Sequence, residues 1–178
     1  MKIGLCGTMS VGKTTFVNYL EKNFDLGYKF FTERSQYLKG LGIPLNLDST
    51  LKGQSIFLAE RASELLNDNF ITDRSVIDVM AFTRHADSIR PSEKDDFEAH
   101  AANLINEYDL ILYVPPGDIK IEDNGVRETD ADYRRSIDQE IQRLLVKYRH
   151  KIKNLDTLKG KNKSRYITFM SAYNKLIK

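Results

Sequence analysis

The sequence has few of the residues that cross-link or interrupt a chain. It contains one cysteine, Cys6, so no internal disulfide can form, which fits a reducing cytoplasm. Only four prolines and ten glycines occur, and no low-complexity stretch separates one part from another. No apolar run approaches the length that spans a bilayer, and the apolar stretch at residues 2–6 is too short for a signal peptide. We therefore expect a single cytoplasmic domain over residues 1–178, with no membrane contact.

The formal net charge is only +2, but the charges are unevenly distributed. Basic residues crowd the segment 143–165, in which Asp156 is the only acid. The basic residues of this segment are Arg143, Lys147, Arg149, Lys151, Lys153, Lys159, Lys161, Lys163 and Arg165. Such a cluster could attract nucleic acid or another phosphate-rich partner. The alternative, which the mixed composition favours, is a solvated helix face followed by a lysine-rich surface loop.

Short apolar segments alternate with segments of helical periodicity along the whole chain. Strands are expected at residues 2–6, 28–32, 70–72, 110–114 and 166–170. Helices are expected at residues 13–22, from a cap at Ser49 or Thr50 to 67, at 76–84, from a capping box at 92–95, from Asp130 or Asp132 to 148, and after 170. Strands separated by helices predict an α/β fold with a parallel sheet and right-handed crossovers.

A complete phosphate-binding loop joins the first expected strand to the first expected helix. Its sequence is Gly7-Thr8-Met9-Ser10-Val11-Gly12-Lys13-Thr14, which matches G-x-x-x-x-G-K-[ST] in the strand-to-helix context that the motif requires. Gly7 and Gly12 allow a tight curl whose N–H groups point at phosphates, and the helix dipole adds positive potential. Lys13 can bridge the β- and γ-phosphates, Thr14 can complete a magnesium shell, and Thr15 can contact the α-phosphate. The sequence therefore predicts a bound nucleoside triphosphate with Mg²⁺.

The loop alone does not choose between a switch GTPase, a motor ATPase and a small-molecule kinase. The sequence has no N-K-x-D motif for reading guanine, and the chain is too short for a motor with sensor and arginine-finger subdomains. Ligands of open parallel sheets lie beyond the carboxyl ends of the strands, so the other strand ends carry the remaining evidence.

Charged pairs follow two of the expected strands. Asp73 ends the 70–72 strand and can hold magnesium, while Arg74 offers a rigid fork to an anionic or hydroxyl-rich acceptor. Glu33 and Arg34 end the 28–32 strand, where Glu33 can take a proton from an acceptor hydroxyl or orient it. The alternative for both pairs is an exposed turn stabilised by surface ion pairs.

A lid is expected around residues 117–135. Arg127 lies in its polar part and can neutralise charge on the transferred phosphoryl group. Arg134 and Arg135 follow on the next helix, either as part of the lid or as a charged helix face. Near the acceptor, Gln54 can read a base edge or lie on the surface, and Asp78 can border the site.

Taken in order, these motifs resemble a known family. The segments concerned are the loop, Thr32-Glu33-Arg34, Thr72-Asp73-Arg74-Ser75, residues 108–113 and residues 118–127. The chain resembles, from residue 1 to about 145, the AAA-domain family typified by the ribosylnicotinamide kinase domain of the bacterial NAD regulator. Deoxynucleoside and thymidylate kinases are close relatives of that family. The basic stretch 149–165 matches nothing that we can place in this pattern.

The resemblance implies a P-loop NTPase fold, a three-layer sandwich with a five-stranded parallel sheet. It implies ATP on residues 7–15 and Mg²⁺ at Thr14 and Asp73. The acceptor would lie near Glu33, Arg34, Gln54, Arg74 and Asp78, with Lys13, Glu33, Asp73 and Arg127 serving transfer.

We therefore expect an ATP-dependent phosphotransferase that acts on a nucleoside or a (deoxy)nucleoside monophosphate. Two alternatives stay open: a kinase acting on a nucleotide within or at the end of DNA or RNA, and a regulatory ATPase without a small acceptor. The sequence fixes neither the acceptor nor the oligomeric state, for which a homodimer is one option.

Overall fold

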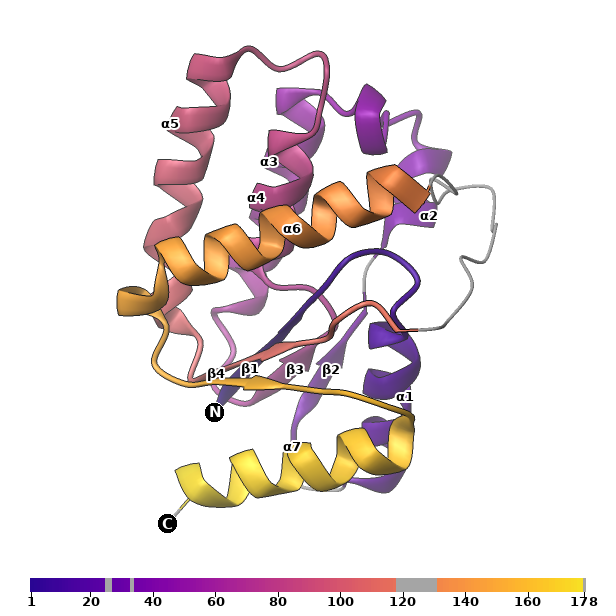
Figure 1. Cartoon of the computed structure of the whole chain (residues 1–178), viewed down its shortest axis with the longest axis vertical. Helices are drawn as coiled ribbons and strands as arrows, with labels where there is room; N and C mark the ends of the chain where they lie inside the picture. The colour runs from indigo at the N-terminus through magenta and orange to yellow at the C-terminus, as the bar shows by residue number, and fades with distance from the viewer. Residues whose placement is uncertain (25–26, 33, 118–130, 178) are drawn as a thin grey trace.

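The computed structural model describes residues 1–24, 27–32, 34–117 and 131–177, and its centre is a parallel five-stranded sheet (Figure 1). The strands are β1 (Lys2–Cys6), β2 (Lys29–Phe31), β3 (Phe70–Thr72), β4 (Leu110–Tyr113) and β5 (Leu155–Thr157). Their order in the sheet is β2-β3-β1-β4-β5, and every neighbouring pair is parallel. The carboxyl ends of all five strands therefore meet at one edge, as the predicted α/β fold requires.

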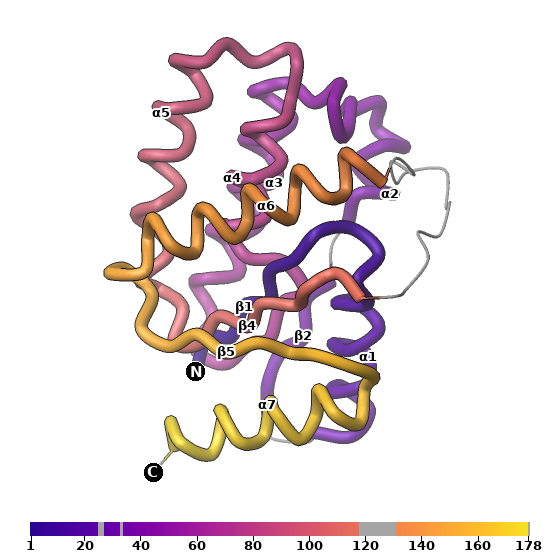
Figure 2. Tube along the Cα trace, viewed as in Figure 1, coloured from indigo at the N-terminus to yellow at the C-terminus, as the bar shows by residue number. Residues whose placement is uncertain are grey.

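Helices cover both faces of this sheet and complete a three-layer sandwich. They are α1 (Lys13–Asn23), α2 (Ser35–Gly40), η1 (Asn46–Asp48), α3 (Leu51–Glu64), α4 (Val76–Arg84), α5 (Pro91–Ala101), η2 (Ala102–Glu107), α6 (Ala131–Lys147), η3 (Arg149–Lys151) and α7 (Asn162–Leu176). Figure 2 shows α3, α4, α5 and α6 on one side of the strands and α1 with α7 on the other. Among the described residues, no helix is both long and apolar enough to cross a membrane.

Side chains that alternate along the strands divide between two apolar cores. Ile3 and Leu5 of β1 pack with α1 and α7, whereas Cys6 and Phe70 pack with α3 to α6. Burying an apolar side chain of this size stabilises a fold by roughly 1.5–3 kcal/mol. Both faces of the sheet are thus covered, which is typical of parallel sheets and holds the strand ends rigid.

Local capping explains where two of the helices begin. Thr50 is the cap of α3, as predicted, and its side chain accepts a hydrogen bond from the N–H of a residue in the first turn. The prediction that a cap at Ser92 opens the next helix is wrong, because α5 already begins at Pro91. Proline suits the first helical position, and the Glu93 carboxylate accepts from the backbone N–H of Arg90 at 3.1 Å.

The C-terminal part of the chain differs from the sequence-based prediction. Residues 166–170 belong to helix α7, and the last strand is instead β5, a segment of three residues inside the basic stretch. The aromatic residues that suggested a strand recur at helical spacing. Phe169 and Tyr173 lie one turn apart and stack at 5.8 Å between ring centroids. The short β5 carries too little apolar sequence to stand out among its lysines.

Candidate active site

The phosphate loop connects β1 to α1 at the carboxyl edge of the sheet. Its backbone adopts positive φ at Gly7 (153°), Ser10 (56°) and Gly12 (80°), and Gly12 caps helix α1. A Cβ at Gly7 would overlap the carbonyl oxygen of Val114, so a side chain is excluded there sterically as well. Changes of backbone handedness of this kind form a concave nest of N–H groups that suits an anion.

Lys13 is buried inside this loop, with 6% of its surface exposed. Its ammonium group donates hydrogen bonds to the carbonyl oxygens of Gly7 and Thr8, the latter at 2.9 Å. The carboxylate of Asp78 lies 3.7 Å from the Lys13 Nζ. The lysine is therefore oriented along the loop and lines the cavity in front of it.

A hydroxyl and a carboxylate meet beside the lysine, at the adjoining ends of α1 and β3. The Thr14 Oγ1 donates a hydrogen bond of 2.5 Å to Asp73 Oδ2, and Asp73 is 1% exposed. Magnesium in phosphate-transfer sites typically takes one or two oxygen ligands from the protein and the rest from water and phosphates. The pair Thr14 and Asp73 fits that ligand set.

A large cavity of about 1510 Å³ lies in front of the loop. Residues Met9 to Thr15 line it, whereas Gly7 and Thr8 of the same loop do not. Pockets for one drug-sized ligand are usually about 300–1,000 Å³, so this cavity has room for two ligands of nucleoside size or larger. No Asp or Glu is among the described residues that line it, which makes the cavity suited to anions.

One wall of the cavity, contributed by α3, α4 and the β3–α4 turn, combines apolar rings with a few polar groups. Gln54 lies there with 4% of its surface exposed, beside Phe57 of the same helix. Arg74 places its guanidinium 4.9 Å from the centroid of the Phe82 ring, a distance typical of a cation–π contact. Gln54 and Arg74 thus both line the cavity, and their role in an acceptor site stays a prediction.

A second wall was missed by the sequence-based prediction. Residues 159–165, between β5 and α7, line the same cavity as the phosphate loop. This segment follows the carboxyl end of a parallel strand, the position where ligands of such sheets bind. The sequence did not place residues 159–165 at a strand end, because β5 itself was not predicted. Four of the nine basic residues of the predicted segment therefore line the cavity: Lys159, Lys161, Lys163 and Arg165.

Two predicted acceptor residues lie away from the cavity wall. Asp78 is fully buried on α4, where its carboxylate accepts hydrogen bonds from the backbone N–H groups of Gly7 at 3.1 Å and Ser75 at 3.2 Å. Burial raises the pKa of Asp78, and the Lys13 ammonium opposes that shift. Arg34 is exposed, with its guanidinium over the ring of Tyr37 at 4.3 Å. Asp78 thus supports the phosphate loop from behind.

Several predicted site residues lie outside the described part of the chain or beside its gaps. Glu33 and Arg127 lie outside the described residues, as does most of the expected lid at 117–135. Arg134 on α6 contacts the phosphate loop: its Nη2 is 3.3 Å from the Ser10 carbonyl oxygen, and its own carbonyl accepts from Thr8 Oγ1 at 3.0 Å. Arg135 is exposed and pairs with Asp132.

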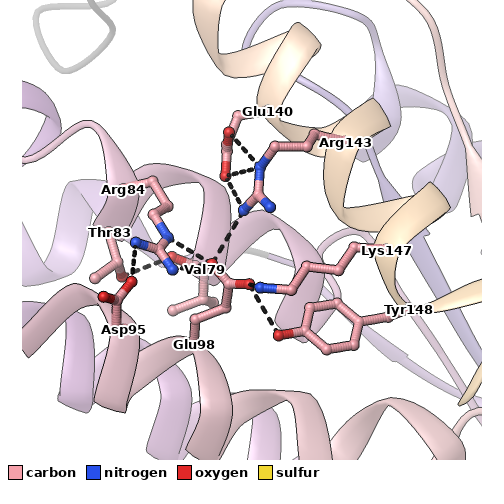
Figure 3. Close-up of polar contacts among 9 residues, drawn as sticks. All are labelled: Val79, Thr83, Arg84, Asp95, Glu98, Glu140, Arg143, Lys147 and Tyr148. Atoms are coloured by element: carbon pink, nitrogen blue, oxygen red, sulfur yellow. Dashed lines mark hydrogen bonds and ion pairs between the residues drawn. The ribbon is translucent and has the colours of Figure 1, made fainter. Parts of the chain in front are cut away.

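Three cations in the first part of the basic segment pair with acids. Figure 3 shows Glu98 of α5 at the centre of a cluster that joins three helices. Its carboxylate, 2% exposed, lies 3.0 Å from Arg143 Nη2 and 2.7 Å from Lys147 Nζ of α6, and 2.5 Å from Arg84 Nη2 of α4. Lys153 pairs with Asp109 at 3.0 Å. These three cations are therefore paired with acids, and contact between the basic segment and nucleic acid stays a prediction.

Together the parallel sheet, the loop between β1 and α1, and the cavity at the carboxyl edge define a P-loop α/β protein with a nucleoside-kinase-like fold. The chain belongs to a family described as AAA domain, whose sequence profile matches residues 2–165. That family is the one that the motif order suggested. A comparison with curated proteins finds no match.

Solved structures show where the same fold occurs. Deoxyadenosine kinase from M. mycoides, with products dCMP and a flexible dCDP bound, has a TM-score of 0.70 at 18% sequence identity, covering 98% of this chain and 100% of that one. The same kinase with bound dCTP gives 0.71 at 19% identity, again covering 98% and 100%. The NadR protein in complex with NR gives 0.74 at 18% identity. That match covers 98% of this chain, which spans half of the NadR chain.

Proposed function

We propose that this protein is an ATP-dependent kinase that transfers the γ-phosphate to a nucleoside or a nucleoside monophosphate. The observation that carries the proposal is one cavity with a phosphate loop at one end and the Gln54 wall at the other. A donor and an acceptor bound in one cavity can react without diffusion between separate sites, which lowers the entropic part of the barrier. Deoxyadenosine kinase and NadR, which share the fold, were solved with nucleotides and with NR.

The donor half would use the phosphate loop and the second wall. ATP would place its β- and γ-phosphates on the loop's N–H groups, and Lys13, held by the carbonyl of Thr8, would neutralise them. The adenine and ribose would then extend toward residues 159–165 and Pro115, which line the cavity on that side. The lysines of this segment would add positive potential around the triphosphate.

Thr14 and Asp73 would hold Mg²⁺ in this proposal, because their oxygens already converge at 2.5 Å beside the loop. The ion would supply charge neutralisation between the β- and γ-phosphates. Asp73 is held in place by burial at the end of β3, so its carboxylate would keep one orientation through the reaction.

The acceptor half would recognise a base and a sugar. The Gln54 amide offers one donor and one acceptor group to a base edge, and Phe57 and Phe82 offer apolar ring surface for the base. Arg74, positioned over Phe82, would hold the sugar hydroxyl or the acceptor phosphate. Glu33 would orient or deprotonate a hydroxyl acceptor, and Arg127 would close over the triphosphate.

The experiment that tests the proposal is a screen for transfer of radiolabelled γ-phosphate. Acceptors would include the ribo- and deoxynucleosides, their monophosphates, nicotinamide riboside and short oligonucleotides. We expect transfer to one small acceptor class, and loss of at least about 100-fold in rate for Lys13→Met, in line with removal of one transition-state contact. Glu33→Gln separates acceptor types, because it should stop transfer to a hydroxyl and spare transfer to a phosphate that is already ionised.

The same assay tests the two alternatives. A regulatory ATPase would release inorganic phosphate at the same rate with and without an acceptor. A kinase of polynucleotides would label only the oligonucleotides. Either result would contradict the proposal that the acceptor is a small nucleoside or nucleotide.

A further inference from the structure

Arg165, in the first turn of α7, is a buried arginine that contacts the phosphate loop. It is 5% exposed, and its Nη1 and Nη2 lie 3.2 Å and 2.8 Å from the carbonyl oxygens of Gly12 and Val11. These two carbonyls belong to the segment of the loop that turns into α1. The contact spans more than 150 residues of sequence, so it is a product of the fold and not of local structure.

The geometry of an anion-binding loop creates a need for such a donor. When successive N–H groups of a loop point inward at a ligand, its carbonyl oxygens point outward. Buried carbonyl oxygens without a donor cost free energy, and water is largely excluded here because Val11 is 1% exposed. A planar guanidinium can satisfy two carbonyls at once and fix their relative orientation, whereas an ammonium group is a single point charge. Arg165 therefore fixes the loop in its inward-facing form.

The charge of Arg165 has no acidic counterpart among the described residues. Its side chain donates to the neutral carbonyls of Val11 and Gly12, and its Nε is buried and makes no hydrogen bond within the described part of the chain. Burial lowers the pKa of Arg165, and no carboxylate opposes that shift. Buried charges are normally paired, so a cation in this position calls for an anion in the adjoining cavity, which Arg165 also lines.

The same residue connects the two walls of the donor site. The segment that precedes it lines the cavity, and the Arg165 N–H donates to the carbonyl of Lys161 at 3.0 Å. The Arg165 side chain thus contacts the phosphate loop, while its backbone bonds to Lys161 in the segment that lines the cavity. A shift of α7 would therefore move both the loop and the second wall.

We propose that Arg165 is a positioning residue of the donor site, which holds the Val11 and Gly12 carbonyls and supplies positive charge that the nucleotide phosphates balance. This inference rests on the donor half of the proposed function and goes beyond the loop motif itself. Because it concerns nucleotide binding alone, its test needs no acceptor. A failure to find a phosphorylated nucleoside would leave that test intact.

The test compares Arg165→Met and Arg165→Lys with Lys175→Met, which removes an exposed positive charge from the same helix. Calorimetric titration with MgATP measures the donor site, and titration with magnesium tripolyphosphate measures the phosphate loop without a base. We expect Arg165→Met to weaken both ligands by about tenfold or more, as loss of charged hydrogen bonds implies. Arg165→Lys should weaken the binding of both ligands by less, because it keeps the positive charge and loses only the planar guanidinium that contacts two carbonyls. Lys175→Met should bind both ligands like the wild type.

Two results would overturn the proposal. If Arg165→Met weakens MgATP but not tripolyphosphate, the residue acts on the base or ribose and does not position the loop. If both affinities stay unchanged, it is an ordinary core residue. Circular dichroism and thermal unfolding check the fold of each variant. Should Arg165→Met fail to fold, Arg165→Lys decides the matter, and an unchanged tripolyphosphate affinity in that variant counts against the proposal.

Discussion

At the scale of single residues, charged side chains from three helices hold the phosphate loop in place. Asp78 accepts the Gly7 N–H and lies 3.7 Å from Lys13, and Arg134 and Arg165 reach loop carbonyls from α6 and α7. Each contact joins the loop to a different helix. A loop whose N–H groups must converge on phosphate cannot stabilise that backbone by itself, so the surrounding fold supplies the partners.

Substitution of Asp78 tests this support. Asp78→Asn keeps the shape but removes the charge that faces Lys13, and it should lower the free energy of unfolding by about 1–3 kcal/mol. Asp78→Ala also removes the acceptor of the Gly7 and Ser75 N–H groups, and a loss of about 3–5 kcal/mol is expected. Urea unfolding measures both values. Asp87→Ala, an exposed acid after the same helix, should stay within about 0.5 kcal/mol of the wild type. Equal losses in the free energy of unfolding for Asp78→Ala and Asp87→Ala would contradict the role of Asp78 in supporting the phosphate loop.

Substitution of Gln54 tests the acceptor wall. The side chain is 4% exposed and lines the cavity, so Gln54→Ala should remove hydrogen bonds to a base edge without touching the phosphate loop. Steady-state kinetics should show the KM for the acceptor rising by about 10-fold or more and the KM for ATP within about twofold. Gln36→Ala, a more exposed residue at the cavity margin, is the matched control. A change in the KM for ATP alone would move Gln54 to the donor half.

At the scale of elements, the Glu98 cluster ties α4, α5 and α6 into one block. Burial raises the pKa of Glu98, but hydrogen bonds from Lys147, Tyr148 and Arg84 outweigh it and lower the pKa to about 2. An acid whose pKa is depressed by folding stabilises the fold above its ordinary pKa, here 4.5, and loses that contribution as the pH falls toward 2. The cluster therefore holds the helices together at neutral pH.

The variant Glu98→Gln leaves three cations around a neutral amide, so we expect a loss of about 3–5 kcal/mol at pH 7. Chemical unfolding at several pH values measures the difference from the wild type. That difference should be constant above pH 4.5 and shrink as the pH falls toward 2, because Glu98 itself becomes protonated there. Asp95→Asn removes an exposed carboxylate of the same cluster and should cost at most about 1 kcal/mol. A pH-independent difference would show that charge is not what Glu98 contributes.

The sequence predicts an element well when that element carries a clear apolar run or a clear helical periodicity. The strands β1 and β4 and the helices α1 and α4 were predicted within a few residues, because apolar runs and helical periodicity are clear there. The three residues of β5 carry no such run, and α2, six residues long, was not predicted. The phosphate loop needed only local sequence. The second wall at residues 159–165 could not be located, since its place depends on which strand precedes it.

The aromatic cluster between α1 and α7 tests the corrected C-terminal element. Phe169 is fully buried and lies 5.2 Å from the Phe24 ring and 6.3 Å from the Phe16 ring, between centroids. Phe169→Ala should lower the free energy of unfolding by about 3–5 kcal/mol. Ile167→Ala, at a side chain 71% exposed, should change it by less than about 0.5 kcal/mol. Equal losses at the two positions would conflict with the helix that the structure shows.

At the scale of the whole molecule, the cavity lies where three parts of the chain converge. The phosphate loop, the α3–α4 wall and residues 159–165 come from the start, the middle and the end of the sequence. The α3–α4 wall packs in the core on one face of the sheet, and α7 packs in the core on the other. A ligand that spans the cavity therefore contacts elements from both cores, and its binding should stabilise the molecule as a unit.

Thermal unfolding in the presence of MgATP measures how much the bound ligand stabilises the molecule. A ligand that binds only the folded state at about 100 times its Kd adds about 2.7 kcal/mol to the free energy of unfolding. For a domain of this size each kcal/mol raises Tm by about 2–4 °C, so we expect an increase of about 5–11 °C. Lys13→Met should remove most of this shift, because the variant loses the cation that faces the β- and γ-phosphates. Lys22→Met, an exposed lysine at the other end of the same helix, should keep it. A shift of the same size in Lys13→Met would place ATP somewhere other than the phosphate loop and would contradict the donor site proposed above.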